Sequence, residues 1–286
     1  MAATGAGTAM AAPIAADVMM VVDESGSMSG EHAWLGSMVT SLESGLTGAG
    51  VGSGSDSNDY GLVGFGTYYH GGGYSEVPHK HTVGSGDWGS ASDLSTATGG
   101  LTTSGGTEDG WRAISFALGA YGYDANHAAN VILVTDEDRD NTDGSITYNS
   151  VLSGLKKYNA LLNAVVNAQF VCGDQTRALG IDSKGNGYVA DGNGGYTTCT
   201  GAHATWGSGT TISDYVDLAL ATGGAAWDLN QLRAGGNTAT SFTNAFIDIK
   251  VQEIQQQPPT GVPEPATLAL MGVGLIGAAA SRRKKK

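Results

Sequence analysis

Basic residues are scarce in this sequence, which has 14 Lys and Arg against 27 Asp and Glu and a net charge of −13. Five of the basic residues lie together at positions 282–286, and without them the balance is 9 against 27, or −18. Nucleic acid and anionic membranes repel a body of this charge. The composition therefore excludes a nucleic-acid partner and is typical of a soluble extracellular protein that meets divalent cations.

Motifs of the common catalytic sites are also absent. The sequence has no Gly-x-Ser-x-Gly elbow, no His-Glu-x-x-His helix and no phosphate-binding loop. It shows no internal repeat with a period of about 20 to 50 residues, which argues against a solenoid or propeller. We expect a binding or structural protein and not an enzyme.

Charged residues are few, at 14%, whereas Gly contributes 46 of the 286 residues. Such a chain is too apolar for disorder and too rich in glycine for a tightly packed helical protein. Apolar runs of strand length alternate with segments of helical periodicity. This alternation predicts an α/β fold with a doubly wound, Rossmann-like, mostly parallel sheet and one short antiparallel strand.

The expected strands are 17–22, 60–65, 130–135, 161–171 and 225–229, and the expected helices are 31–46, 107–121, 148–159, 212–221 and 238–253. Two segments rich in Gly and turn-forming residues, at about 66–100 and 172–211, are expected to form hairpin-rich insertions.

Three loops of this predicted fold offer oxygen ligands at strand or helix ends. The candidate ligands are Asp23, Ser25, Ser27, Thr107 and Asp136. Each loop taken alone is also compatible with a simple turn that leads into a helix cap. Because the carboxyl ends of parallel strands meet at one edge of a sheet, we expect the three loops to converge there. Hydroxyl and carboxylate oxygens suit a hard divalent cation such as Mg2+.

This residue set resembles that of the von Willebrand factor A domain, and the resemblance extends from about Asp17 to Ile254. The resemblance implies a metal-ion-dependent adhesion site for Mg2+ or Mn2+. In that family's pattern, Ser25 and Ser27 bind the ion directly, and Thr107 does so directly or through water. The two acids, Asp23 and Asp136, hold coordinated waters and orient the hydroxyls.

Neutral hydroxyl ligands do not quench the charge of the ion, which then accepts a carboxylate from a partner. The implied partners are an acidic protein ligand or an extracellular polysaccharide. Two functions follow. The chain is an adhesion or biofilm-matrix protein that binds through this ion, or it is a structural matrix component in which the ion only stabilises the fold.

The third loop departs from the Thr-Asp-Gly sequence that is usual in that family, because Glu137 follows Asp136. Further acids follow, and the candidate accessory cation ligands are Glu137, Asp138, Asp140 and Asp143. Two interpretations stay open: a second cation site, most suitably for Ca2+, or a solvated acidic loop.

The C-terminal segment has three parts after a linker at 255–261: the motif Val262-Pro263-Glu264-Pro265, an apolar stretch at 266–280, and the basic cluster at 282–286. This layout resembles the PEP-CTERM sorting signal of Gram-negative bacteria. The resemblance implies a transient anchor in the inner membrane, cleavage by an exosortase, and delivery to the cell surface or extracellular matrix. An ordinary tail anchor is the alternative. Residues 1–16 lack the basic start of a signal peptide, so we expect the export signal to lie upstream of Met1.

The two cysteines, Cys172 and Cys199, flank a loop of Gly, Asn, Asp and Tyr residues. We expect them to form a disulfide in an oxidising compartment, with free thiols or a metal pair as the alternatives. Three histidines, His70, His79 and His81, offer zinc ligands, but no cysteine or acid motif in the sequence completes a site around them. Among the tryptophans, Trp88 and Trp206 lie in expected loops and are candidate sugar-stacking residues, whereas Trp111 and Trp227 are expected in the core.

Overall fold

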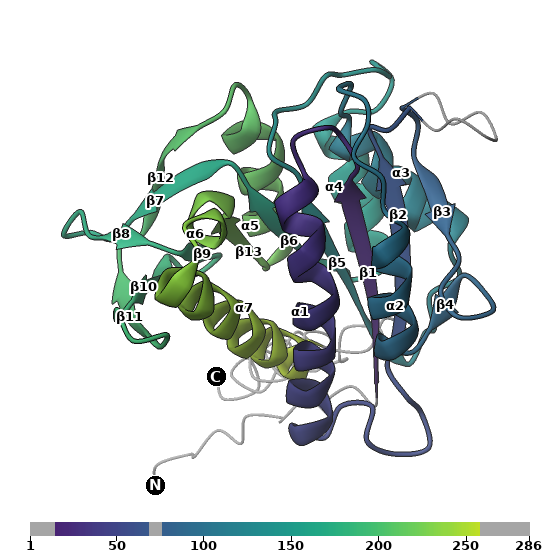
Figure 1. Ribbon diagram of the computed structural model, residues 1–286, viewed down its shortest axis with the longest axis horizontal. Helices are drawn as coiled ribbons and strands as arrows, with labels where there is room; N and C mark the ends of the chain where they lie inside the picture. Colours follow the sequence, from purple (N-terminus) through teal and green to yellow (C-terminus); the bar gives the residue numbers. More distant parts are fainter. Residues whose placement is uncertain (1–14, 69–75, 258–286) are drawn as a thin grey trace, which may run out of the picture.

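A ten-stranded mixed sheet runs through the centre of the computed structural model, which describes residues 15–68 and 76–257 (Figure 1). The strand order is β11-β10-β9-β13-β6-β5-β1-β2-β3, and β4 pairs with β2. The strands are β1 (Ala15–Asp23), β2 (Asp59–Phe65), β3 (His79–His81), β4 (Trp88–Gly89), β5 (His127–Val134), β6 (Leu161–Val166), β9 (Gly180–Asp182), β10 (Asn186–Ala190), β11 (Tyr196–Thr200) and β13 (Ala225–Asp228). A separate small sheet holds β7 (Ala168–Val171), β8 (Arg177–Ala178) and β12 (His203–Gly207).

The five central strands, β13-β6-β5-β1-β2, are all parallel. Every residue of β1 is buried, as expected for an unbroken apolar run covered on both faces. The expected doubly wound α/β fold is confirmed. Antiparallel strands extend the sheet at both edges, β3 and β4 on one side and β9, β10 and β11 on the other. There are more of them than the single strand expected, because the glycine-rich hairpins add their strands to the open edges of the sheet.

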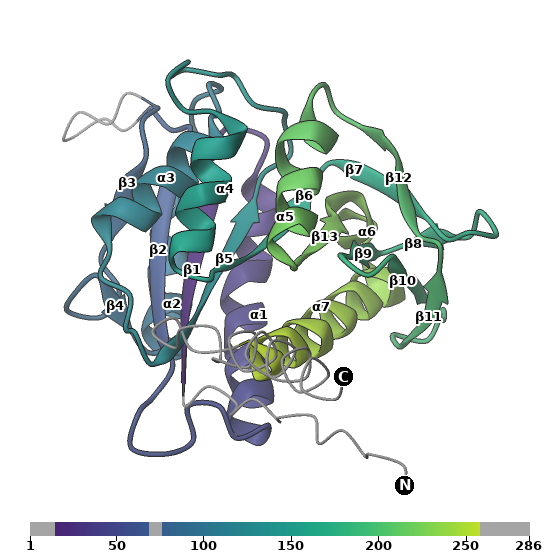
Figure 2. The same ribbon diagram turned by 180° about the vertical axis from the view of Figure 1, so that it is seen from behind.

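Helices cover both faces of the sheet (Figures 1 and 2). One face carries α1 (Ser29–Gly48), α2 (Ala91–Ala97), α6 (Leu229–Arg233) and α7 (Gly236–Gln256), whose apolar side chains share one core cluster. The other face carries α3 (Gly110–Ala120), α4 (Tyr148–Lys157), a π-helical segment (Ile212–Val216) and α5 (Asp217–Thr222). A single 3-10 turn (Thr98–Gly100) follows α2. No helix in 15–68 or 76–257 is long and apolar enough to cross a bilayer.

Three elements differ from the expected ones. The strand expected at 161–171 is two strands, β6 and β7, which end and begin on either side of Asn167 and belong to different sheets. The helix expected to begin at Thr107 begins at Gly110, because the Asp109 side chain accepts a hydrogen bond from Arg112 N and caps the helix there. The insertion near residues 66–100 contains α2, whose capping box joins Ser90 and Asp93.

The four tryptophans considered in the sequence lie partly where they were expected. Both Trp111 and Trp227 are buried in the core. Trp88 is half-buried in β4 between Tyr121 and Tyr123. Trp206 remains 47% exposed on β12.

The two cysteines form a disulfide that joins the segment after β7 to β11, with Cα atoms 5.9 Å apart. The expected pairing of Cys172 with Cys199 is therefore confirmed, and it closes a loop over a sequence separation of 27. The bond ties the small sheet to the antiparallel edge of the large one.

Reduction of this disulfide is expected to lower the free energy of unfolding by about 3 kcal/mol, because the unfolded chain gains the entropy of the opened loop. Urea unfolding of the double variant Cys172→Ser/Cys199→Ser, compared with the oxidised wild type, measures the loss. The double variant should not respond to a reductant. A reductant-dependent shift in that variant, or no shift in the wild type, would contradict the assignment.

Candidate metal centre

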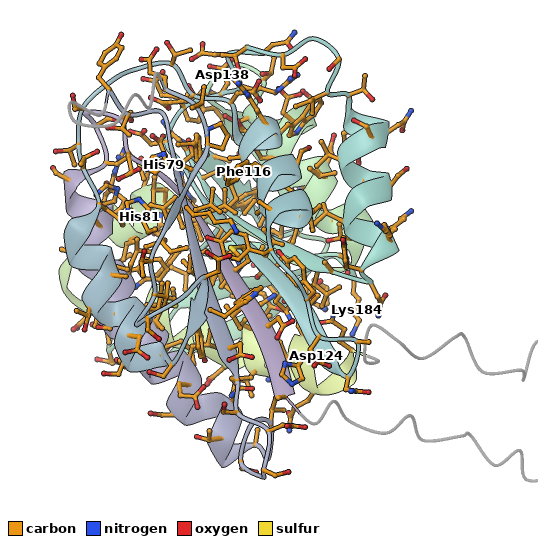
Figure 3. All side chains as sticks on the ribbon, turned by 90° about the vertical axis from the view of Figure 1, so that its right-hand side faces the viewer. His79, His81, Phe116, Asp124, Asp138 and Lys184 are labelled. Atoms are coloured by element: carbon orange, nitrogen blue, oxygen red, sulfur yellow. A yellow bond between two sulfur atoms is a disulfide. The ribbon has the colours of Figure 1, made fainter. Side chains whose placement is uncertain are left out.

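Three loops meet at the carboxyl ends of the central parallel strands, the end of the molecule that Asp138 marks in Figure 3. The first loop joins β1 to α1, the second precedes α3, and the third follows β5. Backbone hydrogen bonds hold the first loop in place: Glu24 N donates to Phe65 O at 2.8 Å, Ser104 N to Glu24 O at 2.9 Å, and Gly26 N to Gly105 O at 3.3 Å. The pairing of strands thus brings the three distant segments to one place.

Four of the five predicted ligands are linked by side-chain hydrogen bonds. The Asp23 carboxylate accepts from Ser25 N at 2.7 Å and from the Thr135 hydroxyl at 2.8 Å. The Ser25 and Ser27 hydroxyl oxygens are 3.1 Å apart, and Ser27 donates to Asp136 Oδ1 at 2.8 Å. Asp23 and Asp136 are buried, whereas Ser27 is exposed.

The fifth predicted ligand, Thr107, is half-buried in the second loop. Within the described residues, its hydroxyl makes no hydrogen bond with the other four ligands. The side chain that the second loop does contribute is Glu108, which the sequence analysis did not single out. Carboxylate oxygens of Asp23, Glu108 and Asp136 all lie within 4.8 Å of one another.

The convergence of three buried carboxylates creates an electrostatic demand for a cation. Burial raises the pKa of Asp23, and burial together with the neighbouring Asp23 raises the pKa of Glu108 to about 9. Glu108 is 1% exposed, and its Oε2 atom has no hydrogen-bond partner among residues 15–68 and 76–257. An all-oxygen donor set of carboxylates and hydroxyls suits Mg2+ or Mn2+. The residues present therefore fit the ion implied by the sequence.

The sequence could have indicated Glu108 as a ligand, because it directly follows the predicted ligand Thr107. It was not predicted because the helix was expected to begin at Thr107, which placed Glu108 in the first helical turn. An acid in the first turn of an exposed helix is common for reasons of the helix dipole alone. Because α3 begins only at Gly110, Glu108 instead belongs to a loop that turns into the site.

Arg233, at the end of α6, also reaches the site from a distant part of the sequence. Its Nη2 atom lies 2.8 Å from Asp136 Oδ2, and its Nε atom lies 2.5 Å from Glu31 Oε1. The guanidinium orients Asp136 and offsets part of the local negative charge. It contacts neither Asp23 nor Glu108, so the buried pair of carboxylates remains uncompensated by it.

Three of the four acids of the proposed accessory cation site accept hydrogen bonds from separate donors. Asp138 accepts a hydrogen bond from Thr210 N at 3.1 Å, Asp140 from Glu108 N at 2.6 Å, and Asp143 from the Ser145 hydroxyl at 2.6 Å. Glu137 is exposed. None of these acids belongs to a converging group of metal-ligating atoms in the described part of the chain.

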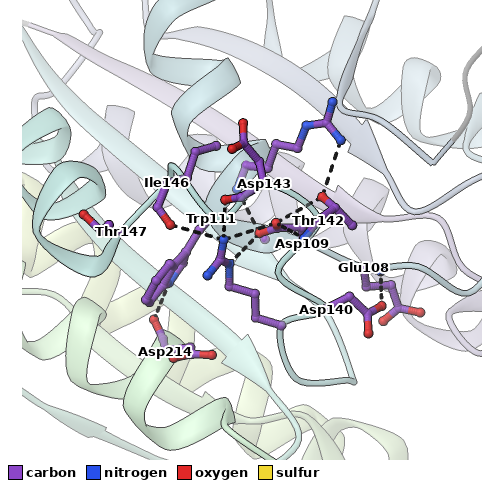
Figure 4. Close-up of polar contacts among 12 residues, drawn as sticks. Glu108, Asp109, Trp111, Asp140, Thr142, Asp143, Ile146, Thr147 and Asp214 are labelled. Carbon is purple, nitrogen blue, oxygen red and sulfur yellow. Dashed lines mark hydrogen bonds and ion pairs between the residues drawn. The ribbon is translucent and has the colours of Figure 1, made fainter.

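A network around Asp109 fixes the third loop against α3 (Figure 4). The Arg139 guanidinium pairs with Asp109 at 2.7 Å and lies 4.3 Å from the Trp111 ring centre. Trp111 in turn donates to Asp214 O at 2.7 Å. Since Asp140 accepts a hydrogen bond from the backbone N–H of Glu108, the acidic loop helps to position Glu108 at the candidate metal centre.

Comparison with known proteins identifies the C-terminal segment. Residues 261–284 match the family model described as the PEP-CTERM protein-sorting motif. The motif marks an exported protein. The matched tail, including Val262 to Pro265 and the apolar stretch, lies outside the described residues, as do His70 and the segment before Ala15. A comparison with curated protein sequences gives no match.

The solved structures that this chain is similar to include proximal thread matrix protein 1 from the mussel byssus, whose structure is described as having a zinc-occupied MIDAS motif. The match has 18% identity and a TM-score of 0.41, and it covers 55% of this chain and 37% of that one. The pilus adhesin SpaC from Lactobacillus rhamnosus GG matches at 20% identity and a TM-score of 0.37, covering 53% and 24%. The pilus tip protein Mfa5 from Porphyromonas gingivalis matches at 18% identity and a TM-score of 0.31, covering 44% and 20%. The chain thus spans well under half the length of these structures.

The stability of the metal-free protein is expected to fall as pH rises. The folded-state pKa of Glu108, about 9, lies above its ordinary value of 4.5, so the folded state binds more protons between these two values. The contribution of Glu108 to the free energy of unfolding is complete below pH 4.5 and is lost as the pH approaches 9. Urea unfolding in EDTA at several pH values measures this slope.

The matched variant is Glu108→Gln, which keeps the side-chain size and removes the titrating group. It should lose most of the slope in EDTA, and added Mg2+ should reduce the slope in the wild type. An equal slope in both proteins would show that Glu108 is not the titrating group.

Proposed function

We propose that this chain is an exported member of the von Willebrand factor A family that binds an acidic partner through Mg2+ or Mn2+ at the cell surface or in the extracellular matrix. In this proposal the protein acts by binding and not by catalysis. The observation that supports it is the meeting of Asp23, Ser25, Ser27 and Asp136, with the buried Glu108, at one rim of the sheet.

The hydrogen-bond pattern suggests how the ligands divide their tasks. Both Asp23 and Asp136 already accept hydrogen bonds, so they orient the hydroxyls and hold water. The hydroxyls of Ser25 and Ser27 are left to bind the ion. Because Ser27 is exposed and the carboxylates are buried, the open coordination position would face solvent.

The charge of the protein makes an ion necessary for this kind of partner. A chain with a net charge of −13 repels an acidic protein or polysaccharide at long range. A divalent ion bridges the two surfaces at short range, where a partner carboxylate completes its coordination. Binding should therefore depend on the ion far more than on ionic strength.

The adhesion function predicts that Ser27→Ala abolishes cation-dependent binding, while thermal stability in EDTA changes little because the hydroxyl is exposed. The affinity for Mg2+, measured by titration calorimetry, should fall at least about tenfold. Surfaces coated with polyglutamate should retain the wild type in Mg2+ and release it in EDTA, with polyglutamine as the probe control.

Ser29→Ala is the matched control, because Ser29 is an exposed serine at the start of α1 and is not one of the candidate ligands. It should bind as the wild type does. Equal retention of wild type and Ser27→Ala in Mg2+ would contradict the adhesion function.

A structural role is the second candidate, and it has its own support. The buried carboxylates come from three loops, so an ion among them would join segments far apart in the sequence. If Mg2+ raises the melting temperature but retention on biofilm material or polyglutamate is the same with and without EDTA, this role is favoured over adhesion.

The sorting tail gives an independent prediction. In the cell of origin, deletion of residues 262–286 should release the body into the medium, because the segment that an exosortase recognises is lost. Immunoblots of medium and cell fractions measure the partition. Retention of the truncated protein at the surface would count against the sorting role, and replacement of Glu264 by Gln tests the motif itself.

A further inference from the structure

A second group of metal-ligating atoms lies beside the first loop, on the other side of β2. His79 and His81, both labelled in Figure 3, stand at alternate positions of β3 and share a face of the strand. Their Nε2 atoms lie 2.9 Å and 3.3 Å from the same oxygen, Glu24 Oε2. No acid motif in the sequence completes a site around these histidines, and the structure shows that Glu24 of the first loop lies beside them.

These short approaches bring two imidazole nitrogens against one carboxylate oxygen. Glu24 Oε2 and His81 Nε2 are buried and have no well-formed hydrogen bond within residues 15–68 and 76–257. His79 Nδ1 lies 3.2 Å from Val77 O, and a carbonyl oxygen can only accept. His79 Nδ1 therefore donates this hydrogen bond, and Nε2 is the ring nitrogen that faces Glu24.

Two imidazole nitrogens and a carboxylate oxygen that converge within 4.8 Å are the arrangement of a metal site. Tetrahedral Zn2+ with bonds of about 2.0–2.1 Å places its ligand atoms roughly 3.3 Å apart. The two observed separations, 2.9 Å and 3.3 Å, are close to such an edge. The bond from His79 Nδ1 to a backbone carbonyl is the outer contact that orients most zinc-bound histidines.

The local backbone makes room for this cluster. Gly64 on β2 pairs with His79, and a Cβ atom at Gly64 would lie 1.9 Å from Glu24 Oε2 and 2.7 Å from His81 Nε2. Any larger residue would force the carboxylate and the imidazole apart. A cavity of about 250 Å³ adjoins the cluster and is lined by Glu24, Thr67, His79, Lys80, His81, Thr82, Gly100 and Thr102. This volume holds several water molecules.

We propose that Glu24, His79 and His81 bind one Zn2+ ion, with water from the adjoining cavity as the fourth ligand. Two imidazoles and one carboxylate favour Zn2+ over Mg2+, whereas the centre at Asp23 offers only oxygen. The proposal does not depend on the adhesion function.

The bound ion would join the insertion to the first loop. Glu24 stands between Asp23 and Ser25, and its Oε1 atom accepts from Thr102 N at 2.7 Å. Zinc at Glu24 would therefore connect β3, the first loop and the second loop, the last two of which carry ligands of the candidate Mg2+ centre.

The test is a titration of the full chain with Zn2+ alone, using a chromophoric chelator as competitor. We expect one site per chain that His81→Ala weakens at least about tenfold, as does Gly64→Ala. His203→Ala is the matched control, because His203 is exposed on β12, and it should leave the affinity unchanged.

Ser27→Ala separates this site from the centre at Asp23. Zinc binding that survives Ser27→Ala and is lost in His81→Ala supports the proposal, and the reverse pattern overturns it. Circular dichroism of each variant establishes that it folds. If His81→Ala does not fold, the visible spectrum of the Co2+-loaded wild type decides: intense tetrahedral bands support the site, and a weak octahedral spectrum overturns it.

Discussion

Carboxylates that lie within 4.8 Å of one another inside a protein are stable only when protons, donors or cations compensate them. The carboxylates of Asp23, Glu108 and Asp136 lie this close together at the carboxyl ends of the parallel strands. The compensation is shared among segments: Thr135 donates to Asp23, and Arg233 pairs with Asp136. Glu108 Oε2 has no donor among the described residues, and this makes the rim of the sheet a candidate site for a divalent ion.

The alternation of side chains along the first loop connects two parts of the molecule. Asp23 and Ser25 contact the residues of the oxygen-ligand centre, whereas the Glu24 side chain between them points to β3. The antiparallel insertion therefore contacts the first loop as well as the edge of the sheet. Through His79 and His81 it reaches the same loop that presents the candidate Mg2+ ligands, so the geometry of the insertion and that of the rim depend on each other.

The parts of the fold that could be predicted are those governed by local pattern. Continuous apolar runs such as 18–22 and 131–134 predicted buried parallel strands, and their ends located Asp23 and Asp136. A helix was expected at 212–221, but its first part, Ile212–Val216, is π-helical, which was not predicted. The short helix α2 was not predicted either, because a short helix in a glycine-rich segment carries a weak periodic signal. The segment 161–171 was expected to be one strand, but it forms β6 and β7, which pair in different sheets.

The sequence by itself determined which residues could bind a cation, which strands would be buried and which tail would direct sorting, because these depend on residue type and short spacing. Only the tertiary structure decided that Glu108 and Arg233 join the candidate centre and that Glu24 meets His79 and His81. It also decided that Asp138, Asp140 and Asp143 accept hydrogen bonds from separate donors. The physical reason is distance along the chain. Contacts between segments tens to hundreds of residues apart are set by strand order and loop path, which no local pattern encodes.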